Sequence, residues 1–240
     1  CEWRLVSLQG GSKRNAIARE ARALLLVENP QALAAEITAQ RQLLSAEYAE
    51  RDGGLNIAFA PANPSEAPLD RASSLRVAQL LQALPHGVTR ATSLLGQPVT
   101  ATSTNLAIVA SAPESVSVIT NQRSFSLSEK RDLAATVRAI GELAGARAVS
   151  GQHYPGWQPD LNSPLLTAAQ EAYRALSGAE ARLEVIHAGL EAGVIKDKLP
   201  ELDTIAIGPE ILDAHSPSER VPIASVAKFW DFLLEILRCY

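Results

Sequence analysis

The sequence reads VTATSTNLAIVA from Val99 to Ala110, SAPE from Ser111 to Glu114 and SVSVITNQR from Ser115 to Arg123. The two outer runs are rich in Thr, Val and Ile, which favour strands, and the middle run carries a turn signal. We therefore predict a β-hairpin. If its turn centres near Pro113, Asn105 and Arg123 face each other or nearly so, on one face of the sheet.

The segments around this hairpin predict an α+β first part. Strands are expected over 2–8 and 15–27, on either side of a turn at Gly10-Gly11. Apolar residues at helical spacing predict helices over 30–50, with Asn29 as N-cap and Pro30 at the first position, and over about 70–84. After the hairpin, Ser126 and Glu129 form a capping box, and Gly145 closes the helix that follows.

From residue 146 the pattern changes to short strands that alternate with helices. Strands are predicted over 146–151, 183–187 and 204–208, and a helix begins at Ser163-Pro164. The last helix carries Ile223, Val226, Trp230, Leu233 and Leu237 on one face, which we expect to be buried against these strands.

These patterns predict two domains, with a boundary near residue 148. Residues 1–148 form an α+β domain with an antiparallel sheet, and 149–240 form part of an α/β domain. The second part has only about three strands, which is few for an independent domain, because such a half-sheet leaves an open edge and an uncovered face.

Composition excludes several classes of protein. A net charge of −4 and the lack of a basic cluster with interleaved aromatics argue against nucleic acid as a partner. No apolar run is long enough to cross a bilayer, and the start shows no signal-peptide pattern. The two cysteines, Cys1 and Cys239, give no disulfide framework and no thiolate zinc site, which indicates a reducing, cytoplasmic setting.

Several short strings, in order along the chain, resemble the cytosolic non-specific dipeptidases, also called aminoacyl-histidine dipeptidases, of the di-zinc metallopeptidase superfamily. They are Gly10-Gly-Ser-Lys-Arg-Asn-Ala-Ile17, similar to the lid motif Gly-Gly-x-x-x-Asn-Ala-Ile-Pro, then Pro85-His-Gly-Val88, Ser103-Thr-Asn105, Tyr154-Pro-Gly-Trp-Gln-Pro159, Ile186-His-Ala-Gly-Leu-Glu191, Ile207-Gly-Pro209 and His215-Ser-Pro217. The sequence departs from the family pattern at Ala18, in place of Pro, and at Asp213-Ala214, where Gly-Pro precedes the histidine.

The resemblance implies a chain that corresponds to the C-terminal portion of such an enzyme. Its first part would be the lid, through which the family forms homodimers, and its second part would be the C-terminal half of the α/β zinc-peptidase catalytic domain. The missing N-terminal half would supply most ligands of the two zinc ions in each full-length subunit. This chain contains no His-x-Asp, no Asp-Asn-Gly and no adjacent Glu-Glu, the motifs that carry those ligands in the family.

The resemblance also assigns roles to individual residues. His215 corresponds to a metal ligand, and Ser216 to Glu219 read as a capping box that would place it on a rigid turn. Asn105 and Arg123 correspond to residues that hold the substrate backbone and its carboxylate, to which the planar guanidinium fork is suited. The remaining candidates for substrate binding are Asn15, His187, Gly189 and Glu191. We interpret His153 and Trp157 as structural.

Each assignment has a plain structural alternative. Asn15 could cap a turn, Arg123 could be a solvated residue at a strand end, and His187 could be a core histidine. The implied reaction is hydrolysis of dipeptides, Xaa-His types included, by a metal-activated water. The alternatives are a related tripeptidase or aminoacylase, or a non-catalytic dimerisation module, in which the missing ligands would need no explanation.

Overall fold

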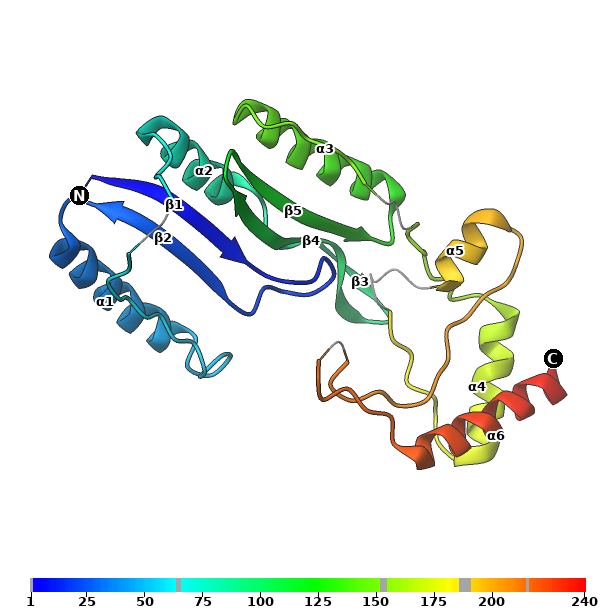
Figure 1. Ribbon diagram of the computed structural model, residues 1–240. Helices are drawn as coiled ribbons and strands as arrows, with labels where there is room; N and C mark the ends of the chain where they lie inside the picture. The colour runs from blue at the N-terminus through cyan, green and yellow to red at the C-terminus, as the bar shows by residue number, and fades with distance from the viewer. Residues whose placement is uncertain (1, 64–65, 152–154, 186–190, 215) are drawn as a thin grey trace. The chain divides into compact units, whose positions relative to one another are not determined.

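The computed structural model of the chain describes residues 2–63, 66–151, 155–185, 191–214 and 216–240 (Figure 1). The strands and helices within them are, in order, β1 (Trp3–Gly10), β2 (Ala21–Val27), α1 (Pro30–Glu47), α2 (Arg71–Ala83), β3 (Gly87–Leu94), β4 (Gln97–Ala112), β5 (Ser115–Ser124), α3 (Leu127–Leu143), α4 (Pro164–Ser177), α5 (Glu191–Lys198) and α6 (Ile223–Cys239). None of these helices is long and apolar enough to cross a membrane.

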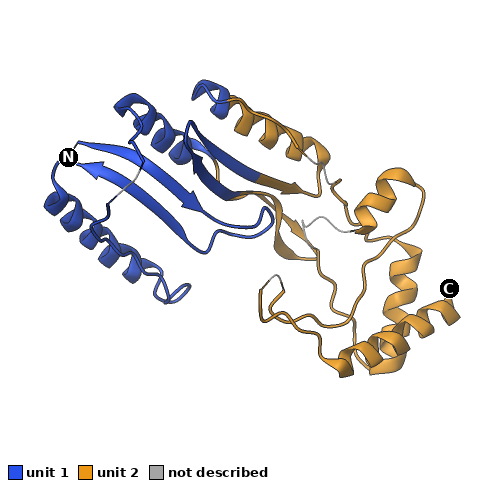
Figure 2. Cartoon of the chain, viewed as in Figure 1, with its two compact units in different colours: residues 1–84, 106–120, 140–146 blue, residues 85–105, 121–139, 147–240 orange. Residues whose placement is uncertain are grey.

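The chain divides into two compact units, which Figure 2 distinguishes by colour. Unit 1 consists of Cys1–Leu84, Leu106–Thr120 and Ile140–Ala146, and unit 2 of Pro85–Asn105, Asn121–Ala139 and Arg147–Tyr240. β4, β5 and α3 each contribute residues to both units. The domain boundary near residue 148 stays a prediction.

The predicted hairpin is confirmed as β4 and β5. β4 is an inner strand of an antiparallel sheet with the order β2-β1-β4-β3, and β5 pairs with β4. With 16 residues, β4 is long enough to pair with β3 from Gln97 to Thr104 and with β1 at Val109 and Ala110. The sequence did not predict β3, because almost all of its side chains are exposed and it therefore lacks an apolar alternation.

Unit 1 is held together around β1. Its residues Leu5 and Val6 are buried. The Leu5 N–H donates a 2.9 Å hydrogen bond to the Ser74 hydroxyl of α2, and the Leu5 carbonyl accepts a 2.8 Å bond from Leu69. The helix starts predicted for this part are confirmed, since Asn29 caps α1 and Asp70 caps α2 through their side-chain oxygens.

Unit 2 has its apolar core where α4 and α6 meet. Ala169 and Ala172 of α4 and Ile236 of α6 are buried, and Phe232 packs against them. Phe232 also meets Tyr173 edge to face, with ring centroids 5.7 Å apart. Ser163 caps α4, so the predicted start of this helix is confirmed, and Gly178 ends it in the left-handed conformation.

Two predictions for the second part are wrong. The described residues of 146–151, 183–185 and 204–208 form no strand. A strand needs a partner for its backbone groups, and no described segment pairs with these residues. The prediction that the apolar face of α6 is buried is also wrong, because Trp230 is 57% exposed and Leu237 is 69% exposed. The mixed α/β fold class itself is confirmed.

Candidate substrate-binding site

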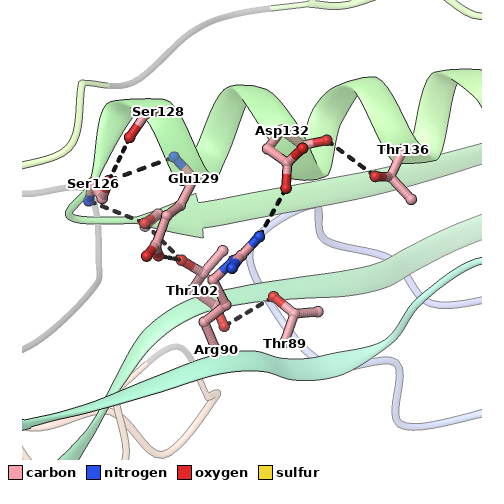
Figure 3. A network of polar contacts seen from close by, with 9 residues as sticks. Thr89, Arg90, Thr102, Ser126, Ser128, Glu129, Asp132 and Thr136 are labelled. Atoms are coloured by element: carbon pink, nitrogen blue, oxygen red, sulfur yellow. Dashed lines mark hydrogen bonds and ion pairs between the residues drawn. The ribbon is translucent and has the colours of Figure 1, made fainter.

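One face of β4 and β5 carries a buried polar network in unit 2 (Figure 3). The Thr102 and Ser124 hydroxyls are 2.8 Å apart, and Thr102 also donates to the Glu129 carboxylate of α3. The Ser126 hydroxyl accepts from the Glu129 N–H at 3.4 Å, as a capping box requires. The second hydrogen bond of the predicted capping box, from the Ser126 N–H to the Glu129 carboxylate, does not form. The Ser126 N–H donates to the Ser124 hydroxyl instead, and the Glu129 carboxylate accepts from the buried Thr102 hydroxyl.

The hydrogen bonds of this network show which side chains of β4 and β5 lie on the face toward α3 and which lie on the opposite face. Thr102 meets Ser124, and Gln122 donates a 3.2 Å bond to the Thr104 hydroxyl, so these side chains share the face toward α3. Because side chains alternate along a strand, Asn105 and Arg123 share the opposite face.

On that opposite face the arrangement differs slightly from the expected one. The pairs Thr102 with Ser124 and Thr104 with Gln122 place Asn121, rather than Arg123, directly opposite Asn105. Arg123 lies diagonally, which is still within reach of a long side chain. Its Nε donates a 3.2 Å hydrogen bond to the Asn121 side-chain oxygen, and all three side chains are half-buried. Amide and guanidinium N–H groups thus gather on one face, as carboxylate binding requires.

The end of β5 lies against the segment that follows α3, in a tight corner. A Cβ built on Gly156 would lie 2.5 Å from the Ser124 carbonyl oxygen and 2.9 Å from that of Phe125. A Cβ on Gly193 of α5 would lie 3.1 Å from the Trp157 Cβ. We call Gly156, Trp157 and Gly193, with the backbone of Ser124 and Phe125, the glycine corner. The interpretation of Trp157 as a structural residue is supported by this contact.

The glycine corner joins two predicted substrate residues. Arg123 immediately precedes Ser124, and Glu191 is the exposed first residue of α5, two residues before Gly193. Close backbone approach at both glycines therefore ties the strand end that carries Arg123 to the start of the helix that carries Glu191. The sequence analysis did not identify these glycines as site-building residues. The signals were the place of Gly156 in the Tyr-Pro-Gly-Trp string and the place of Gly193 two residues after the end of the His-Ala-Gly-Leu-Glu string.

Glu191 also borders a cavity of about 410 Å³ in unit 2. Its other lining residues are Leu165, Ala192, Ile195 and the segment from Leu202 to Ile207. Asp203, in this lining, accepts hydrogen bonds from the Leu165 N–H at 2.9 Å and the Ser163 hydroxyl at 2.8 Å. These bonds, that of Leu165 first, hold the pKa of the Asp203 carboxyl below its usual value.

Asp203→Ala should therefore destabilise unit 2 in a pH-dependent way. A folded-state pKa below the unfolded one means that the stabilisation is complete above about pH 4 and is lost as the pH falls through the folded value. We expect a loss of about 0.5–2 kcal/mol at neutral pH, the range for an N-terminal cap. Urea unfolding from pH 7 to pH 3 measures it. The exposed Asp197 provides the control Asp197→Ala, and an equal loss at all pH values would contradict the prediction.

The remaining candidates are not brought to this place by the described structure. Asn15 is exposed in a turn of unit 1, where the Ala16 N–H donates to the Lys13 carbonyl at 3.4 Å. His187, Gly189 and His215 lie outside the described residues. Among the residues that are described, no group of three or more His, Cys, Asp or Glu side chains could hold a metal ion.

The residues on either side of position 215 explain why Asp213 can stand where the family pattern has Gly. Asp213 has a φ of +53°, a left-handed conformation that Gly adopts most easily and Asp tolerates. Its carboxylate pairs with Arg220, and Leu212 and Arg220 form a β-bridge. The helix predicted to start in Ser216–Glu219 does not form there, since these residues make a turn and α6 starts at Ile223.

The fold superposes on the aminopeptidase PepT of Bacillus cereus with a TM-score of 0.51, over 68% of this chain and 43% of that one; at 18% identity this likeness concerns the fold alone. No protein-family model matches the sequence.

Two dipeptidases are more similar to the chain. It is 36% identical to the cytosol non-specific dipeptidase of Escherichia coli over 239 residues, which are 99% of this chain and 49% of that protein. The aminoacylhistidine dipeptidase of Vibrio alginolyticus superposes with a TM-score of 0.82 and 33% identity, over 98% of this chain and 48% of that one.

The chain thus spans about half the length of the relatives that it matches. This coverage is consistent with the C-terminal portion that the sequence motifs indicate. We call the part of these relatives that this chain does not match the complementary half.

Proposed function

We propose that this chain is the lid and substrate-binding portion of a metal-dependent dipeptidase. The observation that carries the proposal is the identity of 36% over 99% of the chain with a cytosol non-specific dipeptidase. The superposition on an aminoacylhistidine dipeptidase adds support for substrates that include Xaa-His dipeptides. The cytosol origin of the first relative supports a cytoplasmic location.

In this proposal, Arg123 binds the substrate carboxylate through its guanidinium fork, and Asn105 holds the substrate backbone beside it. Asn15, His187, Gly189 and Glu191 complete the substrate contacts. The common face of Asn105 and Arg123, and the glycine corner that ties Arg123 to Glu191, support this grouping.

We propose zinc as the metal, with His215 as the ligand from this chain and the complementary half as the source of the others. Bound zinc would activate a water molecule for attack on the peptide carbonyl. The described residues form no metal site of their own.

We also propose that the lid forms a homodimer. Helix α1 supports this, because none of its residues is fully buried. Leu33, Ile37 and Leu44, at helical spacing, are only half-buried, and Leu43 is 60% exposed. A helix with an apolar stripe is stabilised mostly by covering it. A second molecule of the same chain, related by a two-fold axis, would supply that cover.

The isolated chain should hydrolyse no dipeptide above the buffer rate, with or without added zinc. One histidine does not hold a catalytic zinc, which takes three protein ligands. A substrate panel of Xaa-His and other dipeptides measures this. Chelator-sensitive hydrolysis by the purified chain would contradict it. Hydrolysis of tripeptides or acylated amino acids, but not dipeptides, by the chain joined to the complementary half would favour the tripeptidase or aminoacylase alternative.

Arg123→Ala should lower kcat/KM at least tenfold in a chimera that joins this chain to the complementary half of the Escherichia coli dipeptidase. The charge-assisted, orienting contact to the substrate carboxylate is lost. Arg131→Ala, an exposed arginine on α3, is the matched control and should leave the kinetics unchanged. Wild-type kinetics for Arg123→Ala would refute the role of Arg123, and an inactive wild-type chimera would refute the proposed function.

A further inference from the structure

Arg123 stands on β5 between two residues whose side chains are hydrogen-bonded on the face toward α3. Before it, the Gln122 side chain donates a 3.2 Å bond to the Thr104 hydroxyl, and after it, the Ser124 hydroxyl lies 2.8 Å from the Thr102 hydroxyl. A shift of one residue in the pairing of β4 and β5 would break both contacts and turn Arg123 to the other face. The direction of Arg123 is therefore set by side chains on the opposite face of the sheet.

This part of the hairpin has polar side chains at positions where packing alone would favour apolar ones. Thr102 is fully buried, and Thr104 and Ser124 are 2% and 4% exposed. The positions that continue the same alternation toward the hairpin turn are apolar, namely Leu106 and Ile108 on β4 and Val116 and Val118 on β5. A buried hydroxyl is costly unless its hydrogen bonds form, so these side chains penalise every register that loses their partners.

Helix α3 closes the contacts of Thr102 into a ring (Figure 3). The Thr102 hydroxyl donates to the Glu129 carboxylate, and the Glu129 N–H donates to the Ser126 hydroxyl at 3.4 Å. The Ser126 N–H donates to the Ser124 hydroxyl at 3.0 Å, and Ser124 meets Thr102 again. We call Thr102, Ser124, Ser126 and Glu129 the polar ring.

The Glu129 carboxylate gives every bond of the polar ring a direction. A carboxylate only accepts, so it takes the single hydroxyl proton of Thr102. The Ser124 hydroxyl must then donate to Thr102 and accept from the Ser126 N–H, which leaves it one rotamer that satisfies both. The Ser124 carbonyl is held as well, against Gly156 of the glycine corner.

We propose that Thr102 and Glu129 are positioning residues for the substrate carboxylate: the polar ring fixes Ser124 and thereby the direction of Arg123. Because it acts through Arg123, this role rests on the proposed function. The hydrogen bond of 3.2 Å from the Arg123 Nε–H to the Asn121 side-chain oxygen reports on it, since the two side chains share a face only while the strand keeps this conformation.

The first measurement needs no activity. In nitrogen-15 spectra of the purified chain, the Arg123 Nε–H, identified by its absence in Arg123→Lys, should exchange slowly with solvent. Thr102→Val and Glu129→Ala should each speed this exchange about tenfold or more, because the strand end opens locally. Thr102→Ser and Glu129→Gln keep a hydroxyl and an acceptor oxygen and should exchange as the wild type does. Thr136→Val, at an exposed position of α3, is the matched control and should also match the wild type.

The second measurement uses the chimera with the complementary half. Thr102→Val should raise the KM for dipeptides about fivefold and leave kcat within about twofold, because the carboxylate contact is made equally in the ground state and the transition state. In the Arg123→Ala background, Thr102→Val should raise KM no further, since its effect passes through Arg123. Thr102→Ser should restore the wild-type KM.

Two outcomes would overturn the proposal. They are an unchanged Arg123 Nε–H exchange in both Thr102→Val and Glu129→Ala, and a KM effect of Thr102→Val that adds fully to that of Arg123→Ala, as a purely structural role predicts. If Thr102→Val does not fold, Glu129→Ala decides, because Glu129 is half-buried and water can take the place of its carboxylate. Faster exchange in these variants, combined with wild-type kinetics of Arg123→Ala or an inactive chimera, would retain the positioning of Arg123 and count against the proposed function alone.

Discussion

Replacing Gly11 with Ala should lower the free energy of unfolding of the chain by about 3–5 kcal/mol. Gly11 has a φ of +68°, and a Cβ built on it would lie 1.9 Å from the Ala107 carbonyl oxygen of β4. Ala107 is fully buried, so that carbonyl has no space into which to retreat. The backbone of β1 or β4 would have to shift, at the point where the two strands pair.

Gly145→Ala is the matched control, because Gly145 lies in the same unit and has a φ of +73° with nothing within 4 Å of its Cβ position. It should lose only the conformational cost of about 1–2 kcal/mol. Urea unfolding of the two variants separates the collision from the backbone conformation. If both substitutions lower the free energy of unfolding equally, the close approach to Ala107 is not the reason why position 11 requires glycine.

Gly156→Ala should lower the free energy of unfolding nearly as much as Gly11→Ala does, and Gly156 lies in unit 2. Its Cβ would lie 2.5 Å from the Ser124 carbonyl oxygen and 3.0 Å from the Phe125 carbonyl carbon, which are backbone atoms that have no rotamer by which to escape. We expect a loss of about 2–4 kcal/mol, with opening of the glycine corner. Hydrogen exchange should rise in 124–126 and in α5 and stay unchanged in β1 and β2.

Gly151→Ala provides the control, since no atom lies within 4 Å of its Cβ position and its φ is not in the left-handed region. Its stability should stay equal or rise slightly, because alanine restricts the unfolded chain. In the chimera, Gly156→Ala should also raise KM more than it lowers kcat, as expected for displaced substrate contacts. If the Gly156→Ala chain is as stable as the Gly151→Ala chain, the close backbone approach in the glycine corner does not require glycine at position 156.

Structure that depends on neighbours in sequence was predicted from the sequence. The hairpin follows from two β-prone runs and a turn. The starts of α1, α2 and α4 follow from Asn29, Asp70 and Ser163, whose side chains accept from an N–H three residues on. The motifs that resemble dipeptidases were also legible without the fold, because they are local strings; the residues that they indicate for substrate and metal remain proposals.

Structure that depends on partners distant in sequence was not predicted. We expected Glu129 to complete a capping box with Ser126. Its carboxylate instead accepts a hydrogen bond from the buried hydroxyl of Thr102, which is 27 residues away in the sequence. Residues 204–208 have the composition of a strand, but a strand forms only where another backbone pairs with it. The sequence by itself determined the apolar sides of α6, because helical spacing does so. Only the tertiary structure decided that α4 covers the side of Ile236 and leaves Trp230 exposed, since burial depends on which surface arrives from elsewhere.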